Sequence, residues 1–288
     1  MHRVALISDV HSCFLGLDLV LRDATKRGID EFIFCGDYVS DGPEGEEAIQ
    51  RIKGLKGYII RGNREDYMLA YHDGKASGWN DSLQCAPLLW TYNRLSKSSL
   101  DFIRTLPANL SISLRGQDIL ISHGSPYSAR EPLRPLSNTE RFRQICSDYK
   151  EKVFVFGHTH DLWRLKFEDR YFINAGAPAL PVPGSYPYSH YAYAIMTVSE
   201  TGVSFESVRI PCDFKTFEGY FNSHNYVRDN GMWPKMILAS LKTGPDFCAA
   251  FLDPCHAVAE ANGVVGYKLI PNDIWEKAVA TWPYDVVA

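Results

Sequence analysis

Five short apolar runs in this 288-residue chain each end in a polar motif made of residues that commonly bind metals. The motifs are Asp9-Val10-His11, Gly36-Asp37, Gly62-Asn63, Ser122-His123-Gly124 and Gly157-His158-Thr159-His160. Together they offer two carboxylates, one amide and four imidazoles, a set that no ordinary folding requirement calls for. The chain is therefore expected to fold so that the ends of these runs meet.

The first 60 residues alternate strand-like and helix-like segments. Val4–Ile7, Phe32–Cys35 and Tyr58–Ile60 are unbroken apolar runs, which are typical of strands buried on both faces. The two segments between them have helical spacing, from Phe14 to Ala24 and from Pro43 to Ile52. This alternation predicts an α/β fold, with a parallel sheet and helices outside it.

The middle of the chain mixes helices with hairpins. Residues 64–106 and 139–149 are predicted to be mainly helical, and Val153–Phe156 is a further apolar strand. Alternating patterns around short polar turns predict hairpins over 110–122, 165–173 and 191–210. We therefore expect a layered α/β fold with either one mixed sheet or two packed sheets.

Beyond Pro211 the pattern changes to helices only. The predicted helices are Phe214–Tyr226, Pro234–Leu241, Phe247–Ala261 and Asp273–Ala280. We therefore divide the chain into a domain of residues 1–210, which holds all five motifs, and a helical C-terminal extension of residues 211–288. The extension could cover the site, bind a partner or form a dimer interface, and the sequence leaves the oligomeric state open.

Composition narrows the class of protein. A net charge of −4 and a pI of about 6.1 do not indicate a protein that coats nucleic acid or an anionic membrane. The seven cysteines are scattered without a CxxC pair, so neither a disulfide framework nor a zinc ribbon is expected. The first apolar run is too short for a signal peptide, and no 18-residue apolar run exists. We expect a cytoplasmic location and no membrane partner.

The ligand types indicate the chemistry. Ligands bind at the carboxyl ends of strands in open α/β sheets, which is where these motifs lie. Mixed oxygen and nitrogen ligands suit Mn²⁺, Fe or Zn²⁺, with Co²⁺ or Ni²⁺ in vitro. Two such ions about 3.5–4 Å apart would hold the oxygens of an in-line phosphoryl displacement and lower the pKa of a shared water. The bridging hydroxide would be the nucleophile, so no serine or cysteine is needed for attack.

The order of the motifs resembles that of the calcineurin-like metallophosphoesterase superfamily, whose signature is D-x-H, G-D, G-N-H-[DE], H and G-H-x-H. The resemblance spans residues 4–176 and implies a four-layer α/β/β/α sandwich followed here by the helical extension. It implies Asp9, His11 and His160 on one metal, Asp37 as a bridge, and Asn63, His123 and His158 on the other. It further implies catalytic roles for Asp37, Asn63 and His123, with Asn63 contacting the substrate. We add Arg64 to the catalytic and substrate-contacting residues as a hypothesis of our own.

A second similarity concerns the segment Ile173-Asn174-Ala175-Gly176-Ala177-Pro178. It is similar to the N-P-G-S segment of the small bacterial and archaeal phosphodiesterase-like subgroup. The subgroup resemblance favours a phosphodiesterase, because many of its members also lack the histidine of the G-N-H motif.

Arg64 stands where the superfamily usually has that histidine. In the family the histidine stabilises the transition state and is often assigned to protonate the leaving group. The pKa of arginine is above 12, so it is no practical proton donor, but its planar charged fork can bind phosphate oxygens. We hypothesise electrostatic stabilisation by Arg64 and substrates whose leaving group departs easily, such as activated or cyclic phosphodiesters. The alternative is that Arg64 merely pairs with Glu65 or Asp66 on the surface.

These observations predict a dinuclear metal-dependent phosphoesterase that hydrolyses phosphodiester bonds of a small or nucleotide-like substrate. Manganese is favoured for the two divalent ions, with Fe, Zn, Ni or Co as alternatives. One alternative function is a phosphomonoesterase, including a protein phosphatase-like enzyme, and another is a non-catalytic protein-binding scaffold. A nuclease is disfavoured by the acidic balance and the absence of a basic stripe.

Two aromatic-rich stretches are candidates to stack a nucleobase. They are Trp90-Thr91-Tyr92 and Tyr186-Pro187-Tyr188. Ordinary packing explains such residues more often than a ligand does.

Overall fold

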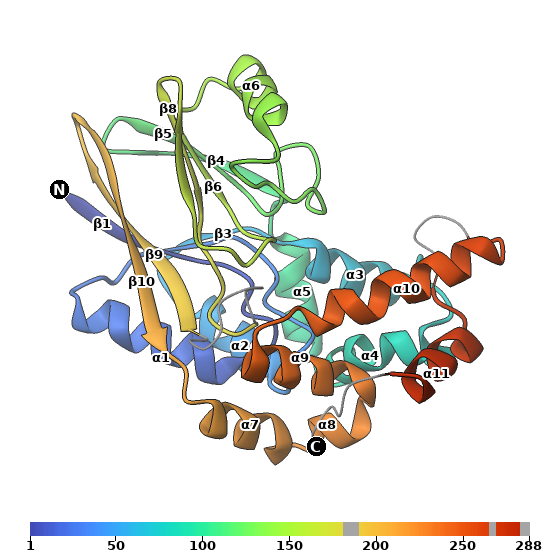
Figure 1. Ribbon diagram of the computed structural model, residues 1–288. Helices are drawn as coiled ribbons and strands as arrows, with labels where there is room; N and C mark the ends of the chain where they lie inside the picture. The colour runs from blue at the N-terminus through green and yellow to red at the C-terminus, as the bar shows by residue number, and fades with distance from the viewer. Residues whose placement is uncertain (181–189, 265–268, 283–288) are drawn as a thin grey trace.

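Two five-stranded sheets pack face to face in the computed structural model, which describes residues 1–180, 190–264 and 269–282. Helices lie on the outer face of each sheet (Figure 1). The arrangement confirms the predicted four-layer α/β/β/α sandwich. The stretch Tyr186-Pro187-Tyr188 lies outside the described residues.

The first sheet has the strand order β10-β9-β1-β2-β3. Its strands are β1 (His2–Ile7), β2 (Phe32–Phe34), β3 (Gly57–Ile59), β9 (His190–Ser199) and β10 (Gly202–Pro211). The first three strands run parallel, while β9 is antiparallel to β1 and forms a hairpin with β10. The carboxyl ends of β1, β2 and β3 therefore meet at one edge of the sheet.

The second sheet has the order β4-β5-β6-β8-β7. Its strands are β4 (Asn109–Leu114), β5 (Gln117–Ser122), β6 (Val153–Phe156), β7 (Arg164–Phe167) and β8 (Arg170–Asn174). The central strands β5, β6 and β8 are parallel, and each flanking strand is antiparallel to its neighbour. This sheet also brings the carboxyl ends of its central strands to one edge.

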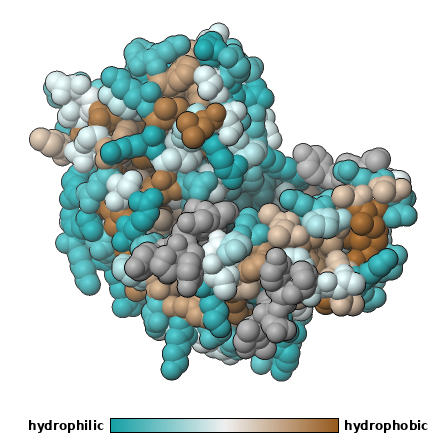
Figure 2. Space-filling model, viewed as in Figure 1, coloured by the Kyte–Doolittle hydropathy of each residue, from teal (hydrophilic) through white to brown (hydrophobic). Residues whose placement is uncertain are grey.

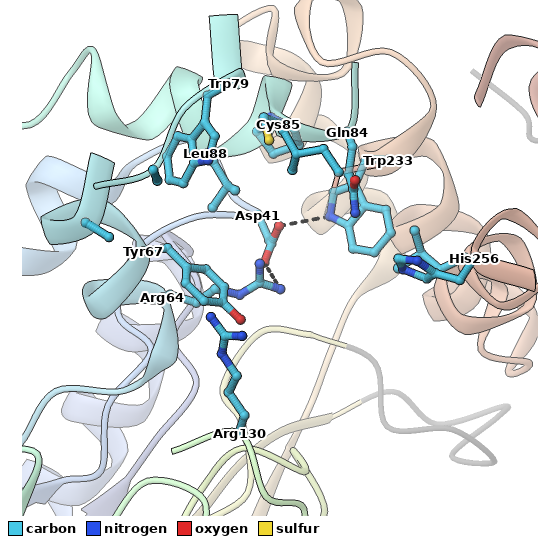
Figure 3. Close-up of a pocket in the computed structure, with 15 residues that line it drawn as sticks. Asp41, Arg64, Tyr67, Trp79, Gln84, Cys85, Leu88, Arg130, Trp233 and His256 are labelled. Carbon is cyan, nitrogen blue, oxygen red and sulfur yellow. Dashed lines mark hydrogen bonds and ion pairs between the residues drawn. The ribbon is translucent and has the colours of Figure 1, made fainter. Parts of the chain in front are cut away.

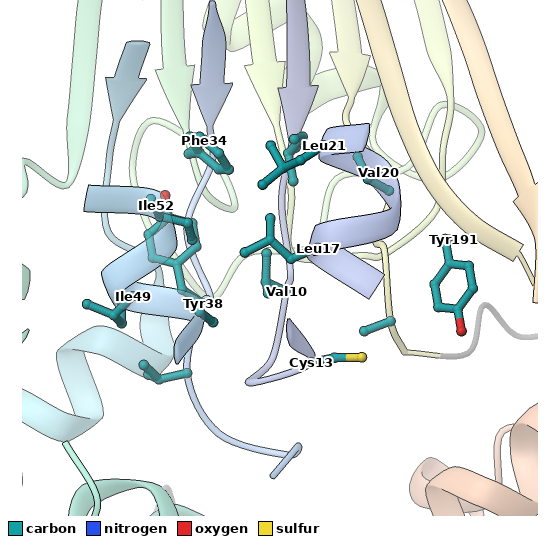
Figure 4. Close-up of a cluster of buried hydrophobic side chains, with 14 of the residues drawn as sticks. Val10, Cys13, Leu17, Val20, Leu21, Phe34, Tyr38, Ile49, Ile52 and Tyr191 are labelled. Atoms are coloured by element: carbon teal, nitrogen blue, oxygen red, sulfur yellow. The ribbon is translucent and has the colours of Figure 1, made fainter. Parts of the chain in front are cut away.

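Helices cover the outer faces of both sheets. The segments before β9 form α1 (Phe14–Lys26), α2 (Gly45–Lys53), α3 (Asn63–His72), α4 (Ala86–Tyr92), α5 (Lys97–Thr105) and α6 (Thr139–Asp148), with short 3₁₀ helices η1 (Trp79–Asp81) and η2 (Leu83–Cys85). Helix α6 packs on the second sheet, while α1 and α2 pack on the first, where Leu17 and Ile49 meet the side chains of the sheet (Figure 4).

The period-2 geometry of β1 explains how one strand serves two cores. Ala5 and Ile7 face the helices α1 and α2, whereas Val4 and Leu6 face the second sheet. All four are fully buried, so the strand reads as a continuous apolar run. Burial on both faces leaves only the strand end available for polar residues, which is where the first motif begins.

The C-terminal extension contains five helices in the described residues. They are α7 (Phe214–Ser223), α8 (Tyr226–Asp229), α9 (Met232–Thr243), α10 (Phe247–Ala261) and α11 (Asn272–Ala280). The single helix predicted over 214–226 is broken, because Asn225 takes a left-handed conformation with φ 58°. Trp90 of the first aromatic stretch is buried edge-on against Tyr226, so it packs in the core.

The apolar contacts of the extension fall into two groups. Phe217 of α7 and Ile237 of α9 belong to the core that also contains α1 and α2. Phe251 of α10 and Trp275 of α11 form a separate cluster with Met236. The change at Pro211 separates strands from helices, and a domain boundary at residue 210 stays a prediction.

Among the described residues, no helix combines the length and the apolar character needed to cross a membrane. Figure 2 shows a face on which hydrophilic residues predominate and hydrophobic ones occur in small groups.

Candidate metal centre

The loops after β1 and β2 continue the pairing of these strands beyond their ends. The amides of Asp9 and His11 donate to the carbonyls of Gly36 and Asp37, at 3.0 and 2.9 Å. The amide of Ser12 donates to the carbonyl of Tyr38 at 2.8 Å. The first two motifs are therefore held side by side by backbone hydrogen bonds.

Two glycines allow the remaining loops to approach. A Cβ atom on Gly62 would lie 2.9 Å from His123 Nδ1, and one on Gly157 would lie 2.7 Å from Asp9 Oδ2. Both distances are shorter than side chains tolerate without a shift. The glycines that flank the polar motifs thus let loops from both sheets converge on one point.

The ligand residues themselves adopt an unusual backbone conformation. Asp9, His11, Asp37, His158 and His160 have positive φ values between 48° and 67°. Non-glycine residues rarely adopt this region, and such strain tends to gather at functional sites. The loops therefore direct these side chains inward at a conformational cost that the surrounding structure sustains.

The first group of candidate ligands comprises Asp9, His11 and His160. His160 Nε2 lies 3.2 Å from His11 Nε2 and 3.5 Å from Asp9 Oδ1. The distance from His11 Nε2 to Asp9 Oδ1 is 3.8 Å. The three ligand atoms therefore surround a space that one cation could fill.

The second group comprises Asp37, His123 and His158. His123 Nε2 lies 3.2 Å from Asp37 Oδ2, and the rings of His123 and His158 have centroids 5.2 Å apart. The ligand atoms of the group lie within 4.8 Å of one another. This set again combines one carboxylate with two imidazoles.

Asp37 lies between the two groups. Its Oδ2 is 3.2 Å from His123 Nε2 and 3.8 Å from His11 Nε2. Its Oδ1 accepts a hydrogen bond of 2.8 Å from the backbone amide of Arg64. One oxygen is thus anchored to the start of α3, while the other occupies the position expected of a shared ligand.

Several buried polar atoms at this site have no hydrogen-bond partner. They include Asp9 Oδ1, Asn63 Oδ1 and His123 Nε2. Burying such atoms without a partner is unfavourable, and each is an atom that binds divalent cations. The described residues therefore fit a divalent metal centre, and Asn63, at the start of α3, offers it an amide oxygen.

A hydrogen bond and an ion pair fix the orientation of two imidazoles. His123 Nδ1 lies 2.7 Å from the carbonyl oxygen of Cys35, which can only accept. His11 Nδ1 lies 3.1 Å from Asp41 Oδ2. These contacts favour a proton on Nδ1 of both rings, so that Nε2 is the atom that would bind a metal, an arrangement that is common around metal-binding histidines.

The charge state of the site is shifted by its neighbours. Burial alone would lower the pKa of His11, but the neighbouring carboxylates of Asp41 and Asp9 raise it to about 9. Burial likewise opposes protonation of His123, yet the neighbouring carboxylates of Asp37 and Asp9 raise that pKa to about 10. Burial lowers the pKa of His160 to about 4. Two imidazolium ions thus balance the carboxylates, a role that bound cations would take over.

Asp41 is a site residue that the sequence analysis missed. It is buried, and its Oδ2 lies 2.9 Å from Arg64 Nη2 as well as 3.1 Å from His11 Nδ1. Its Oδ1 accepts a 2.9 Å hydrogen bond from Trp233 Nε1 on α9. The Asp41-Gly42 pair gives the ordinary signal of a turn, which hides this role.

Glu65 is the second missed residue. Its buried carboxylate accepts hydrogen bonds of 2.7–2.8 Å from the amides of Asp37, Tyr38 and Gly62. Burial and the neighbouring Asp37 raise the pKa of Glu65 to about 7. The carboxylate holds the loop of Asp37 and the loop of Gly62 together. A glutamate three residues after the residue that precedes a helix is typical of helix N-termini, and this spacing is the sequence signal that could have identified Glu65.

The alternative that Arg64 pairs with Glu65 or Asp66 on the surface is wrong. Glu65 is buried against backbone amides, and Asp66 pairs with Arg61 at 2.7 Å. Arg64 pairs with Asp41 and keeps 24% of its side chain exposed. The guanidinium therefore lies at the rim of the metal centre.

The segment after β8 supports the last motif. Asn174 Nδ2 donates to the carbonyl of Gly157 and to Thr159 Oγ1, while its Oδ1 accepts from the amide of Gly176. These bonds hold the loop that carries His158 and His160. The segment similar to N-P-G-S thus has a structural role beside the site.

A cavity of about 420 Å³ adjoins the centre (Figure 3). Asp41 and Arg64 form one part of its wall, and Trp233 and His256 of the C-terminal extension form another. Dashed lines in Figure 3 mark the bonds from Asp41 to Arg64 and to Trp233. The extension therefore reaches the site.

Comparisons with known proteins agree with this geometry. The calcineurin-like phosphoesterase superfamily domain matches residues 2–201. The uncharacterized protein MJ0912 of Methanocaldococcus jannaschii is 26% identical over 234 residues, which cover 74% of this chain and 88% of that protein.

Two solved structures share the fold. A hypothetical protein, PH1004, from Pyrococcus horikoshii has a TM-score of 0.67 at 17% identity, covering 85% of this chain and 99% of that one. A metallophosphoesterase from Sphaerobacter thermophilus has a TM-score of 0.63 at 23% identity, covering 84% and 99%. The likeness extends over nearly the whole length of both solved structures.

Proposed function

Because this chain belongs to the calcineurin-like phosphoesterase superfamily, whose members are metal-dependent phosphoesterases, we propose that it is a dinuclear phosphodiesterase for small or nucleotide-like substrates. The observation that carries the proposal is the pair of ligand groups with Asp37 between them. Asp9, His11 and His160 would hold one ion. Asn63, His123 and His158 would hold the other, and Asp37 would contact both.

When bound, divalent ions supply Lewis acidity at the phosphate and lower the pKa of a water molecule. Manganese is the proposed metal, because carboxylate, amide and imidazole ligands with no thiolate suit it. The protein's own contribution is to hold the metal-binding side chains in position. Carbonyl and carboxylate partners orient the rings of His123 and His11, and the amide of Arg64 fixes Asp37.

We attribute the preference for diesters to Arg64. Burial alone would lower its pKa, but the charges of Asp41 and Asp37 raise it above the usual value. The guanidinium therefore keeps its proton, and it can bind phosphate oxygens but cannot protonate a leaving group. Substrates with an activated or cyclic leaving group need no such acid, which favours diesters of that kind over unactivated monoesters.

The substitution Arg64→His tests this preference. With Mn²⁺, we expect the rate on an unactivated alkyl monoester, such as glycerol 3-phosphate, to rise relative to bis(para-nitrophenyl) phosphate by about tenfold, since general acid catalysis of a poor leaving group contributes about 100-fold or more when well placed. Arg143→His is the matched control, because Arg143 is exposed and pairs with Glu140 on α6. An unchanged ratio in Arg64→His would contradict the role given to Arg64.

The number of metals is tested separately. Elemental analysis of protein purified with Mn²⁺ should give two ions per chain, and fewer would contradict a dinuclear centre. A screen of mono-, di-, cyclic and dinucleotide phosphates then identifies the substrate class. A preference for monoesters across this screen would favour the phosphomonoesterase alternative.

A further inference from the structure

The cavity beside the metal centre is built by segments from both ends of the chain. Ala70 of α3, Trp79 of η1 and Leu88 of α4 line it on one side. Trp233 of α9 and Leu252 of α10 line it on the other. Its volume of about 420 Å³ lies within the range of about 300–1,000 Å³ that is usual for small-molecule sites.

Two residues of the cavity wall lie next to candidate ligands of the metal centre. Arg64 lines the cavity and directly follows the candidate ligand Asn63. Asp41 also lines it and contacts the candidate ligand His11 at 3.1 Å. An ester whose phosphate is bound at the centre and whose ester group extends past Arg64 would place that group in this cavity.

The walls combine aromatic rings with a few polar groups. Tyr67, Trp79 and Trp233 contribute rings, and Trp79 is fixed by stacking on Tyr71 with centroids 4.5 Å apart. Gln84 and His256 add hydrogen-bonding groups, as Figure 3 shows on the side toward Trp233. This mixture suits a flat heteroaromatic ring with polar edges, because the rings offer stacking surfaces and the polar groups offer specificity.

Two guanidinium groups lie at the end of the cavity near the metals. The guanidinium carbons of Arg64 and Arg130 are 5.9 and 4.7 Å from the centre of the Tyr67 ring. Figure 3 shows the two groups close together beside Tyr67. The Asp41 carboxylate, which pairs with Arg64, also lines the cavity, so two guanidinium groups and one carboxylate leave this end with net positive charge. That charge favours an anionic group and disfavours a purely aliphatic ligand.

We propose that this cavity binds the nucleoside part of a nucleotide ester, with the base among Tyr67, Trp79 and Trp233 and the phosphate toward Arg64, Arg130 and the metals. This inference rests on the proposed function and adds the substrate class to it. The C-terminal extension thereby acts as a specificity element, since Trp233 and His256 belong to it.

The test compares binding of two non-hydrolysable probes to the full chain in Mn²⁺, measured by titration calorimetry. The probes are the phosphonate analogues of adenosine 5′-monophosphate and of ribose 5-phosphate, which differ only in the base. We expect the adenosine probe to bind about tenfold more tightly, because stacking of a base on aromatic side chains has an effect of at least this order.

Filling the cavity should remove this difference. In Ala70→Phe the affinity for the adenosine probe should fall to that for the ribose probe, which itself should change little. Leu88→Trp is a second variant that fills the same space, and thermal unfolding verifies that each variant is folded. Ala250→Phe is the matched control, because Ala250 is exposed on α10 and does not line the cavity.

Equal affinities of the wild type for both probes would overturn the inference, as would a base preference that persists in a folded, filled variant. Hydrolysis of bis(para-nitrophenyl) phosphate tells the two proposals apart. Hydrolysis without a base preference leaves the proposed function standing and removes this inference. A base preference that the filled variants abolish, without hydrolysis of any ester, retains the nucleoside site and removes the proposed function.

Discussion

The metal centre and the neighbouring cavity are built in opposite ways. Polar side chains on strand ends form the centre, where backbone hydrogen bonds and close glycine contacts fix each loop. Mainly apolar side chains, most of them on helices, form the cavity, with lining residues drawn from 41–88 and 233–269 together with Arg130. The difference separates two tasks: strand ends position the chemistry, and helix packing shapes the space for the substrate.

Asp41 joins the two regions. Its carboxylate contacts His11 of the centre, Arg64 at the rim and Trp233 of the extension. A change in either region should therefore reach the other through this one side chain. Substitutions that act on the centre, on Asp41 or on the extension should have effects that decrease in this order.

The largest effect is expected from Asp37→Asn. An amide cannot supply the negative charge of a carboxylate between two cations, so activity should fall by about 1,000-fold or more. Rates on bis(para-nitrophenyl) phosphate and metal content per chain measure the loss. Retention of wild-type activity would show that Asp37 does not lie between two metals during the reaction.

A smaller loss is expected from Asp41→Asn, which keeps the size of the side chain but removes its charge. Partners of metal-binding histidines typically contribute about 10- to 100-fold in metal affinity or activity, and we expect a loss in this range. Mn²⁺ binding and hydrolysis rates measure it. Asp101→Asn is the control, because Asp101 is exposed on α5 and pairs with Lys97 of the same helix. Equal effects in the two variants would count against an orienting role.

Metal affinity should depend on pH. The raised pKa values of about 9 for His11 and about 10 for His123 mean that both rings are protonated in the metal-free protein at pH 7. Each metal must displace one such proton, so each affinity should fall about tenfold per unit as pH decreases below about 9 and level off above these pKa values. Mn²⁺ titrations between pH 6.5 and 9.5 check this, and a pH-independent affinity would contradict it.

The smallest effect is expected from Trp233→Phe. This change keeps an aromatic ring in the cavity wall but removes the hydrogen bond to Asp41 Oδ1. One hydrogen bond contributes roughly 1 kcal/mol, which corresponds to about a fivefold loss in activity if the bond serves to position Asp41. Trp275→Phe, in the separate cluster of α10 and α11, controls for loss of packing. A loss as large as that of Asp41→Asn would mean that the extension determines the position of Asp41 outright.

The two regions also differ in what their sequences reveal. The ligand types of Asp9, His11 and Asp37 stand directly after buried strands, so local pattern alone predicts where they gather. The partner of Arg64 was not predictable in this way, because Asp41 lies 23 positions away in a loop that resembles an ordinary turn. The cavity depends on how α9 and α10 come to lie opposite α3 and α4, and such a long-range arrangement has no periodic signal in the chain.

In the fold, too, some features follow from the local sequence pattern and others do not. The four layers follow from the alternation of strands and helices, and the boundaries of β6 and α10 agree with the apolar runs. The break between α7 and α8 was missed, because it depends on a single asparagine in the left-handed conformation.

The sharing of one apolar core by the sandwich and the first helices of the extension has an evolutionary consequence. Phe217 and Ile237 pack with α1 and α2, so deleting the C-terminal extension would expose an apolar face of the sandwich to solvent. Helices α7 and α9 therefore cannot be exchanged as an independent module without repacking the sandwich. If the cavity binds substrate as proposed, its preference can still change through single substitutions at Leu252 or His256 of α10, which lie outside the shared core.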